Sequence, residues 1–417
     1  MIIEMFPAKN GDAFLIRLDN KKNILIDMGY MDTYKTHIKD RLKKIKSENQ
    51  CIDLLVITHI DEDHIEGAIE FIKENGDANN PNIIEIKEIW HNSYRHLQFD
   101  KEKVSKITSF EERRLEEMKL CNSRTARKET NESRPVSGRQ GSTLAGYLFG
   151  LGYEKNIWNA SFINEAIKFK NEAVNLDSKN KIELGDAKIY ILSPDTKKLG
   201  DLSTLWLKKL MEIDINFTIS NEVIFDDAYE MYMKKLKLIS EVDESKDISY
   251  SLKVFNDLID GKIEQGNIDK SKSNGASISF ILEYKNKKLL FLGDSHEDII
   301  VDNLEKYEKD GGSLEFEAVK ISHHGSLKNN FRWIEKIQSK RYLISTNGEN
   351  HDHPSKEVIA KILQCNKEEK TFYFNYPVDI CNVIDEAEDV FKEKYKYSVV
   401  VGNETSSLQI EVRKSDE

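Results

Sequence analysis

Between Val56 and His64 the chain reads Val-Ile-Thr-His-Ile-Asp-Glu-Asp-His, a segment rich in side chains that bind metal ions. Its polar donors are His59, Asp61, Asp63 and His64. The apolar run 54–57 predicts a short buried strand, and apolar residues at helical spacing predict a helix over 65–73. Imidazoles and carboxylates on a strand-to-helix turn can hold a divalent ion. A solvated acidic loop is the alternative, but two histidines directly after a buried strand favour the metal site.

The pattern His-x-Asp-x-Asp-His resembles the signature of the metallo-β-lactamase superfamily, whose usual form is His-x-His-x-Asp-His. Aspartate at the second ligand position is similar to one branch, the hydrolase domain of ComEC-type competence (DNA-uptake) proteins and its stand-alone relatives. Other segments resemble further motifs of the superfamily in the expected order, namely Asn23 to Gly29 with Asp27, Leu289 to Asp294, Lys320 to Ser326 and His353 to Ser355. The resemblance spans residues 1 to about 360, interrupted by insertions.

The resemblance implies a mixed α+β and α/β fold, the four-layer αβ/βα sandwich. Strands that arrive in two batches, each followed by helices, fit this architecture, and its ligands come from loops at one edge of the two sheets. We expect a hydrolase core over 1–365, with charged helical insertions at about 98–180 and 199–272. Residues 366–417 are expected to be a C-terminal extension that packs on the core.

The resemblance also implies a metal centre of one or two divalent ions, Zn²⁺ or Mn²⁺, with Mg²⁺ as a further candidate. His59 and Asp61, together with a ligand from the third or fifth motif, would hold one ion. Asp63 and His64 would hold the other, and Asp294 would bridge them. Two ions about 3.5–4 Å apart can hold a hydroxide and clamp the oxygens of a displacement. In the family analogy Asp63 also orients that hydroxide, which makes it a catalytic residue, while Asp27 supports the turn from the second shell.

The third motif departs from the family pattern. It usually supplies a histidine, but the strand that ends near 192 is followed by Ser193, Pro194 and Asp195. Either Asp195 substitutes for this histidine, or Asp195 stays in the second shell and one ion has fewer protein ligands. Because Asp61 also replaces an imidazole, the site is rich in oxygen donors, which favours Mn²⁺ or Mg²⁺ more than in the usual member.

The fifth motif contains two adjacent histidines. Because successive residues of an extended segment point to opposite sides, we expect His323 to be the ligand and His324 to face elsewhere or to contact substrate. Ser326 is a candidate for substrate binding, and Lys320 is expected to point outward.

Two more residues are candidates for work on a substrate. His353 can contact a phosphate or protonate the leaving group as a general acid, or it can cap the helix that begins near Ser355. Arg139 lies in a Ser-x-Arg-Gln-Gly element similar to one in stand-alone relatives of the ComEC domain. It can bind a phosphate bidentately or brace the insertion against the core.

Composition limits the partners. The chain has 417 residues and a net charge of −11, which weighs against tight nucleic-acid binding by the whole surface but allows a local basic groove. Its cysteines are widely spaced and indicate reduced thiols, so we expect a cytoplasmic protein. We expect no signal peptide and no membrane span, so the transport role of full ComEC proteins is not implied.

The leading functional hypothesis is a metal-dependent phosphodiesterase or nuclease acting on nucleic acid or nucleotides through a metal-bound hydroxide. The rival enzyme class is hydrolysis of a small ester, lactone or thioester, which the acidic charge favours. A non-enzymatic alternative is a metal-stabilised protein that binds a protein partner through its helical insertions. Stand-alone relatives are encoded near bacterial antiviral systems, so a role in antiviral defence is a further hypothesis that rests on context alone.

Overall fold

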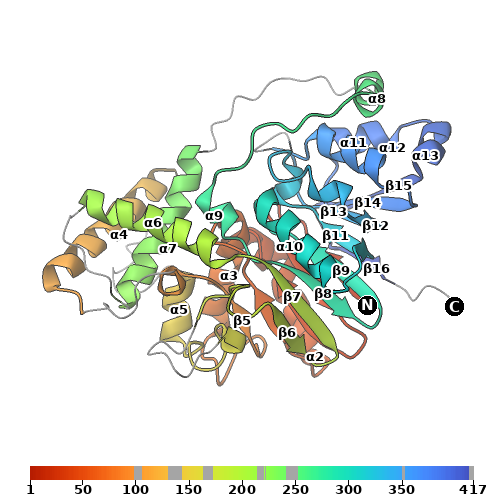
Figure 1. Ribbon diagram of the computed structural model, residues 1–417. Helices are drawn as coiled ribbons and strands as arrows, with labels where there is room; N and C mark the ends of the chain where they lie inside the picture. Colours follow the sequence, from red (N-terminus) through yellow and green to blue (C-terminus); the bar gives the residue numbers. More distant parts are fainter. Residues whose placement is uncertain are drawn as a thin grey trace.

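The structure is a computed structural model that describes residues 1–97, 106–129, 143–162, 172–213, 220, 222–240, 252–349 and 353–412. Two β-sheets pack face to face, and helices cover their outer faces (Figure 1). The four-layer αβ/βα sandwich with helical insertions expected from the sequence is confirmed.

The first sheet has six strands in the order β16-β1-β2-β3-β4-β5. Their bounds are β1 Ile2–Met5, β2 Phe14–Arg17, β3 Asn23–Ile26, β4 Leu54–Val56, β5 Ile89–Trp90 and β16 Leu408–Glu411. β1 and β2 are antiparallel to their neighbours, whereas β3, β4 and β5 run parallel. The loop between β1 and β2 therefore lies at the same edge of the sheet as the carboxyl ends of β3 and β4.

The second sheet has eight strands in the order β15-β14-β13-β11-β9-β8-β7-β6. Their bounds are β6 Lys181–Leu184, β7 Ala187–Ser193, β8 Ser279–Tyr284, β9 Lys287–Phe291, β11 Ala318–Lys320, β13 Arg341–Ile344, β14 Lys370–Phe374 and β15 Tyr397–Val401. In this sheet β9, β11, β13, β14 and β15 run parallel to one another, so their carboxyl ends lie at one edge. A separate parallel pair is formed by β10 Glu315–Phe316 and β12 Gln338–Ser339.

The helices fall into two outer layers and a group of insertions. Their bounds are α1 Met31–Thr33, α2 Lys39–Ser47, α3 Glu62–Asn75, α4 Ser109–Glu129, α5 Leu144–Gly150, α6 Thr196–Ile213, α7 Val223–Ser240, α8 Leu252–Asp260, α9 Lys272–Gly275, α10 Glu297–Lys309, α11 Lys356–Cys365, α12 Asp379–Asp385 and α13 Asp389–Tyr395. α2 and α3 cover the first sheet, α10 and α11 cover the second, and α4 to α7 gather to one side (Figure 1).

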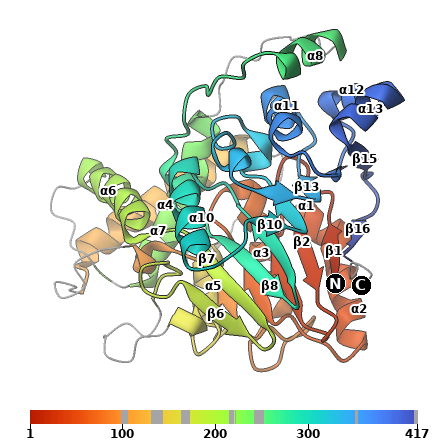
Figure 2. The ribbon, with the colours of Figure 1, turned by 45° about the vertical axis from the view of Figure 1, so that its right-hand side comes forward.

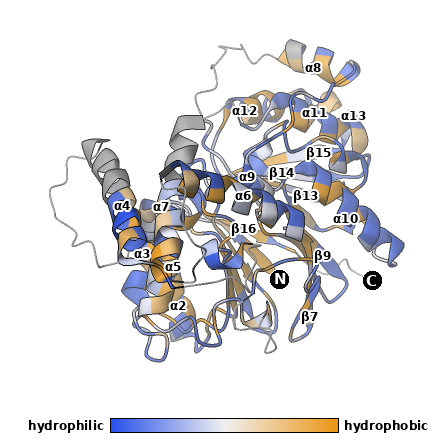
Figure 3. Ribbon diagram, turned by 60° about the vertical axis from the view of Figure 1, so that its left-hand side comes forward, coloured by the Kyte–Doolittle hydropathy of each residue, from blue (hydrophilic) through white to orange (hydrophobic). Residues whose placement is uncertain are grey.

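Alternation along the strands separates the hydrophobic layers. Leu15 and Leu55 face the helices on the outer side of the first sheet, whereas Phe14 and Val56 face the second sheet. There the ring of Phe14 meets that of Phe291 edge to face, with centroids 5.7 Å apart. Figure 3 shows hydrophobic residues gathered on these central strands. The sandwich therefore holds the strand ends, and the loops that follow them, in fixed positions.

Residues 366–417 were expected to be an extension that packs on the core. Within the described part of this segment, β14 and β15 complete one edge of the second sheet, and β16 pairs with β1 in the first sheet. Figure 2 shows β16 beside β1, close to both termini. The segment is thus part of the sandwich itself. The domain boundaries stay a prediction.

The insertions lie where the sequence placed helical segments. The first contains α4 and α5, and the second contains α7, α8 and most of α6, which begins at Thr196. Over the residues that the structure describes, none of the helices combines the length and the hydrophobicity needed to cross a bilayer.

Candidate metal centre

Loops at the carboxyl ends of three strands supply the side chains that can bind a metal ion. Asp61 is the N-cap residue of α3, in extended backbone conformation after β4, so that Asp63 and His64 fall in the first turn of the helix. Asp294 follows β9, and His323 and His324 follow β11. Because both sheets present these strand ends at one edge of the sandwich, residues far apart in the sequence meet there.

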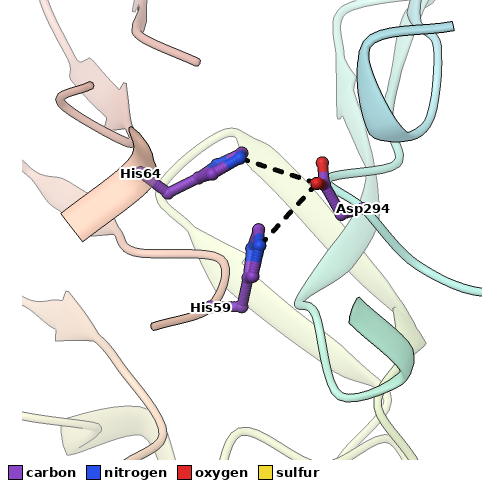
Figure 4. Close-up of side chains that lie close together, drawn as sticks. All are labelled: His59, His64 and Asp294. Carbon is purple, nitrogen blue, oxygen red and sulfur yellow. Dashed lines mark ion pairs between the residues drawn. The ribbon is translucent and has the colours of Figure 1, made fainter. Parts of the chain in front are cut away.

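The carboxylate of Asp294 is the centre of the cluster. Its Oδ2 lies 3.7 Å from the Nε2 atoms of His59, His64 and His324, and 3.9 Å from that of His323. Figure 4 shows the rings of His59 and His64 turned toward this carboxylate. Asp294 is fully buried, and neither of its side-chain oxygens has a hydrogen-bond partner among the described residues. Burial of a carboxylate without hydrogen bonds costs free energy unless a cation lies next to it.

Hydrogen bonds determine which ring nitrogen of each histidine carries the proton. His64 Nδ1 lies 2.8 Å from Asp27 Oδ2, and His324 Nδ1 lies 2.8 Å from the carbonyl oxygen of Ser345. A carboxylate and a carbonyl only accept, so in the neutral ring the proton is on Nδ1 and the lone pair is on Nε2. The buried Nε2 atoms of these two histidines have no hydrogen-bond partner among the described residues.

The same assignment follows for the other two rings. Thr58 Oγ1 donates to Asp27 Oδ2 at 2.7 Å, so at 3.1 Å it accepts from His59 Nδ1. Asn329 directs its amide nitrogen toward Asp269, which leaves its Oδ1 to accept from His323 Nδ1 at 3.1 Å. In their neutral forms all four imidazoles would thus present an Nε2 lone pair to the space around Asp294. A hydrogen bond that orients a ligating histidine in this way is usual in metal sites.

The remaining carboxylates, Asp61 and Asp63, lie beside different histidines of the cluster. Asp61 Oδ2 is 3.4 Å from His59 Nε2, and Asp61 Oδ1 accepts a hydrogen bond of 2.7 Å from Ser273. Asp63 Oδ2 is 3.6 Å from His324 Nε2 and accepts a hydrogen bond from Asn10 at 3.2 Å. The side chains therefore offer two neighbouring sets of nitrogen and oxygen donors.

These residues fit one or two divalent ions. Among the described residues, the ligand atoms of His59, His64 and Asp294 lie within 4.8 Å of one another, and so do those of Asp63, His64 and His324. Imidazole nitrogens with carboxylate oxygens suit Zn²⁺ and Mn²⁺.

The electrostatics also favour a cation. Burial lowers the pKa of His324, but the carboxylates of Asp294, Asp12 and Asp63 outweigh burial and raise the pKa to about 10. Burial raises the pKa of Asp294, yet the surrounding imidazoles hold this pKa well below its usual range. Positive charge is thus stabilised at the place where the Nε2 atoms meet.

The structure corrects the expected orientation of His324. His323 and His324 both have positive φ, 45° and 52°, in a tight turn, so the segment is not extended. Alternation of side chains therefore does not apply, and both rings reach Asp294. His324 lies among the candidate ligands, where the sequence argument had it facing elsewhere or contacting substrate.

Lys320 is also oriented differently from the expectation. It is buried, forms an ion pair with Asp12 Oδ2, and donates to the carbonyl oxygen of Gly293 at 3.0 Å. Its Nζ lies 3.8 Å from Asp294 Oδ1. Burial raises the pKa of Asp12, but Lys320 and His324 outweigh it and lower the pKa to about 2. The outward orientation expected from alternation along the strand is wrong, because an ion pair holds the lysine inside.

Asp27 and Asp195 have different surroundings, although both were expected in the second shell. Asp27 is buried against His64 and Thr58. Asp195 Oδ1 accepts the backbone N–H of Lys198 at 2.7 Å and caps the start of α6. It belongs to none of the close donor groups among the described residues. The structure thus gives Asp195 the role of a helix cap in place of a third-motif donor.

The candidates for substrate binding lie in different surroundings. The ring of His353 lies 5.5 Å from that of His323, and Ser355 occupies the N-cap position of α11, so His353 is not the cap. Ser326 is buried in the turn after the paired histidines, where its backbone N–H donates to the carbonyl oxygen of His323. Arg139 lies outside the described residues. The roles of these residues stay predictions.

Sequence reasoning missed two carboxylates, Asp12 and Asp269. Asp12 Oδ1 lies 3.5 Å from His324 Nδ1, and Asp269 Oδ2 lies 3.6 Å from His323 Nδ1. Asp12 had a usable signal, because the loop between the first two strands must lie at the edge where Asp27 and His59 lie. Asp269 had none, because it comes from an insertion without a regular pattern.

Comparisons with known proteins find similarity over part of the chain and to one solved structure. Residues 7–118 match the family model described as metallo-β-lactamase superfamily, and this segment contains the turn from His59 to His64. Among solved structures, Zn²⁺-bound PqqB from Methylobacterium extorquens is similar at 9% identity and a TM-score of 0.37, covering 99% of this chain and 100% of that chain. No curated protein matches.

Proposed function

We propose that the protein is a divalent-metal-dependent hydrolase that cleaves phosphodiester bonds in nucleic acid or nucleotides. The observation that carries the proposal is the convergence of four Nε2 atoms on Asp294 Oδ2, at 3.7 to 3.9 Å. Metal-dependent hydrolysis is the chemistry that the family match indicates. The choice of a phosphodiester rests on the ComEC-like form of two motifs, with Asp61 in the second and His323-His324-Gly325-Ser326 in the fifth.

The proposed ligands are the side chains that surround Asp294. They are His59, Asp61, Asp63, His64, His323, His324 and Asp294 itself. A divalent ion held there supplies an activated water and a positive charge for the developing negative charge of the transition state. Because Asp61 stands where the family usually has an imidazole, the donor set favours Mn²⁺ for activity more than in the usual member.

The protein side chains would position the substrate and move protons. Asn10 fixes the orientation of Asp63 by its hydrogen bond to Oδ2, and Tyr30 in turn donates to Asn10 Oδ1 at 3.0 Å. His353, which is partly exposed beside His323, can protonate the leaving oxygen. Lys320 adds a buried positive charge near Asp294.

A substrate panel tests the proposal. Single-stranded DNA, duplex DNA, RNA, bis-(p-nitrophenyl) phosphate and lactones are incubated with the protein and Mn²⁺ or Zn²⁺. We expect hydrolysis of at least one phosphodiester, dependent on added metal and lost in Asp63→Asn. Turnover of lactones without any phosphodiester would overturn the assignment.

A second candidate is hydrolysis of a small ester, lactone or thioester. The net charge of −11 favours it, because an acidic protein repels polyanionic substrates. Both candidates use the same metal centre, so the panel separates them directly. A small phosphodiester hydrolysed much faster than DNA or RNA would place the substrate among nucleotides.

A further inference from the structure

We propose that the adjacent His323 and His324 are ligands of two different metal ions that share Asp294. His324 completes a set with Asp63 and His64, and His323 completes a set with His59 and Asp61. His323 thus takes the place of the third-motif histidine that this chain lacks. The proposal rests on the metal centre proposed above and assigns each of its ligands to one ion.

The contacts of His324 place it on the side of Asp63. Its Nε2 is 3.6 Å from Asp63 Oδ2, and its Nδ1 is 3.5 Å from Asp12 Oδ1. Asp12 comes from the β1–β2 loop, whose Gly11 packs so closely that a Cβ there would lie 2.0 Å from the backbone oxygen of Asp63. His324, Asp12 and Asp63 therefore form one wall of the cluster, with His64 beside them.

The contacts of His323 place it on the side of Asp61. The short helix α9 connects them, because Ser273 donates to Asp61 Oδ1 at 2.7 Å and Asn274 donates to Asp269 Oδ2 at 2.8 Å. Asp269 Oδ2 in turn lies 3.6 Å from His323 Nδ1. Asp61 and His323 are therefore both held from α9, whereas His324 contacts Asp12 of the β1–β2 loop.

The turn geometry allows one motif to serve both sides. His323 and His324 have left-handed φ, and Gly325 continues the turn with φ of 93°. The two rings are 5.8 Å apart at an angle of 70°, yet each Nε2 is within 3.9 Å of Asp294 Oδ2. The imidazoles thus approach the shared carboxylate from different directions.

The assignment balances the two donor sets. Asp195, the substitute considered for the third motif, caps α6. Without His323, the set around His59 would consist of His59, Asp61 and Asp294. With His323, each ion has four protein donors, two imidazoles and two carboxylates, when Asp294 is counted in both sets. Four donors are the usual number for a closed zinc site.

Asp269 is then a positioning residue for His323. Its carboxylate also accepts from Asn329 at 3.0 Å, and Asn329 holds His323 Nδ1 through its own oxygen. Loss of such an outer carboxylate commonly weakens metal binding about 10–100-fold. Asp269→Asn should therefore weaken one of the two ions and leave the other unchanged.

Metal content measured on variants tests the proposal. Elemental analysis after Mn²⁺ loading should give two ions per chain for the wild type and one for each of His323→Ala and His324→Ala. His37→Ala, a partly buried histidine on another helix, is the matched control and should keep both ions. Circular dichroism confirms that each variant is folded, and His323→Asn and His324→Asn replace any alanine variant that is not.

Double variants identify which ion each histidine holds. In the His323→Ala background, His59→Ala should cause no further loss, whereas Asp63→Ala should remove the remaining ion. In the His324→Ala background the outcomes should be reversed.

The electron paramagnetic resonance spectrum of the Mn²⁺ protein gives an independent readout. We expect a coupled pair of ions in the wild type and an isolated ion in either single variant. A wild type with one ion, or a His323→Ala protein that keeps both, would overturn this assignment while leaving the proposed hydrolase intact. A wild type that takes up no metal would instead refute the hydrolase proposal itself.

Discussion

Two buried polar clusters of similar composition differ in how their charges are satisfied. The metal cluster consists of His59, Asp61, Asp63, His64, Asp294, His323 and His324. The insertion cluster consists of His91, Arg95, Thr143, Asp226, Asp227 and Glu230. Both combine histidine with carboxylate in a solvent-excluded interior, yet we assign a ligand to only one of them.

In the insertion cluster the carboxylates are hydrogen-bonded to protein donors. Arg95 donates to Asp226 Oδ2 from Nη2 at 2.9 Å and from Nε at 3.1 Å. His91 Nε2 lies 2.8 Å from Glu230 Oε1, and Thr143 donates to Asp227. These bonds join α7 to the segment after β5 and to the start of α5. In the metal cluster, by contrast, Asp294 and the inner nitrogens of His64 and His324 have no such partners among the described residues.

The comparison teaches that burial of charge alone does not identify a ligand site. A cluster whose charged groups are hydrogen-bonded to one another holds two parts of the protein together. A cluster in which buried carboxylate oxygens and imidazole nitrogens lack hydrogen-bond partners can bind a cation. Replacement of a carboxylate should therefore abolish activity in the metal cluster and lower stability in the insertion cluster.

The largest effect is expected on catalysis. Asp63→Ala should abolish measurable hydrolysis of the phosphodiester found in the panel, because it removes a proposed metal ligand. The fold should remain, since the strand and helix around the turn stay packed. Steady-state rates and circular dichroism check both parts. Wild-type turnover in this variant would show that the metal cluster is not the active site.

A large effect on stability is expected in the insertion cluster. Asp226→Ala removes the buried carboxylate that pairs with Arg95, whose side chain is 15% exposed, and should lower the free energy of unfolding by about 3–5 kcal/mol. Urea unfolding measures it. Glu212→Ala, which breaks the exposed pair with Lys209, is the control and should leave the midpoint unchanged. If both variants unfold at the same urea concentration, the insertion cluster does not hold the protein together.

Metal removal should affect stability through the metal cluster alone. An ion at a concentration 100 times its dissociation constant stabilises the folded state by about 2.7 kcal/mol. Addition of chelator should therefore lower the melting temperature of the wild type. In His64→Ala the metal-dependent part should be reduced by the loss of one ion, while Asp226→Asn should keep it in full. Equal responses to chelator in these two variants would remove the distinction between the clusters.

The smallest effect concerns the choice of metal. Because Asp61 replaces an imidazole, we expect higher phosphodiesterase activity with Mn²⁺ than with Zn²⁺, and a shift toward Zn²⁺ in Asp61→His. Activity is compared at saturating metal, since raw affinity follows a general order that ranks Zn²⁺ above Mn²⁺. A wild type most active with Zn²⁺ and unaffected by the substitution would contradict the role given to donor hardness.

The turn from His59 to His64 could be predicted from the sequence because regular elements flank it. An extended strand passes through Asp61 into a helix, so the positions of His59 and His64 follow from the spacing alone. Apolar alternation along the strands likewise predicted the sheets, and the order of the motifs predicted the sandwich.

The fifth motif could not be predicted in the same way. Left-handed φ at His323 and His324 leaves no mark in the sequence, since favourable contacts in the folded protein stabilise it. The ion pair of Lys320 with Asp12 joins the end of β11 to the β1–β2 loop, about 300 residues apart along the chain, and only the sheet topology reveals this contact. Local rules thus sufficed for regular segments and failed where tertiary contacts decide.

The pairing of β1 with β16 has a consequence for how the protein is made. Ile2 meets Glu411 across this ladder, so the first sheet lacks an edge strand until ribosomal synthesis has passed residue 411. β14 and β15 complete the second sheet nearly as late. The amino-terminal strands therefore leave the ribosome with an unpaired edge, a state in which nascent chains are prone to aggregate and bind chaperones.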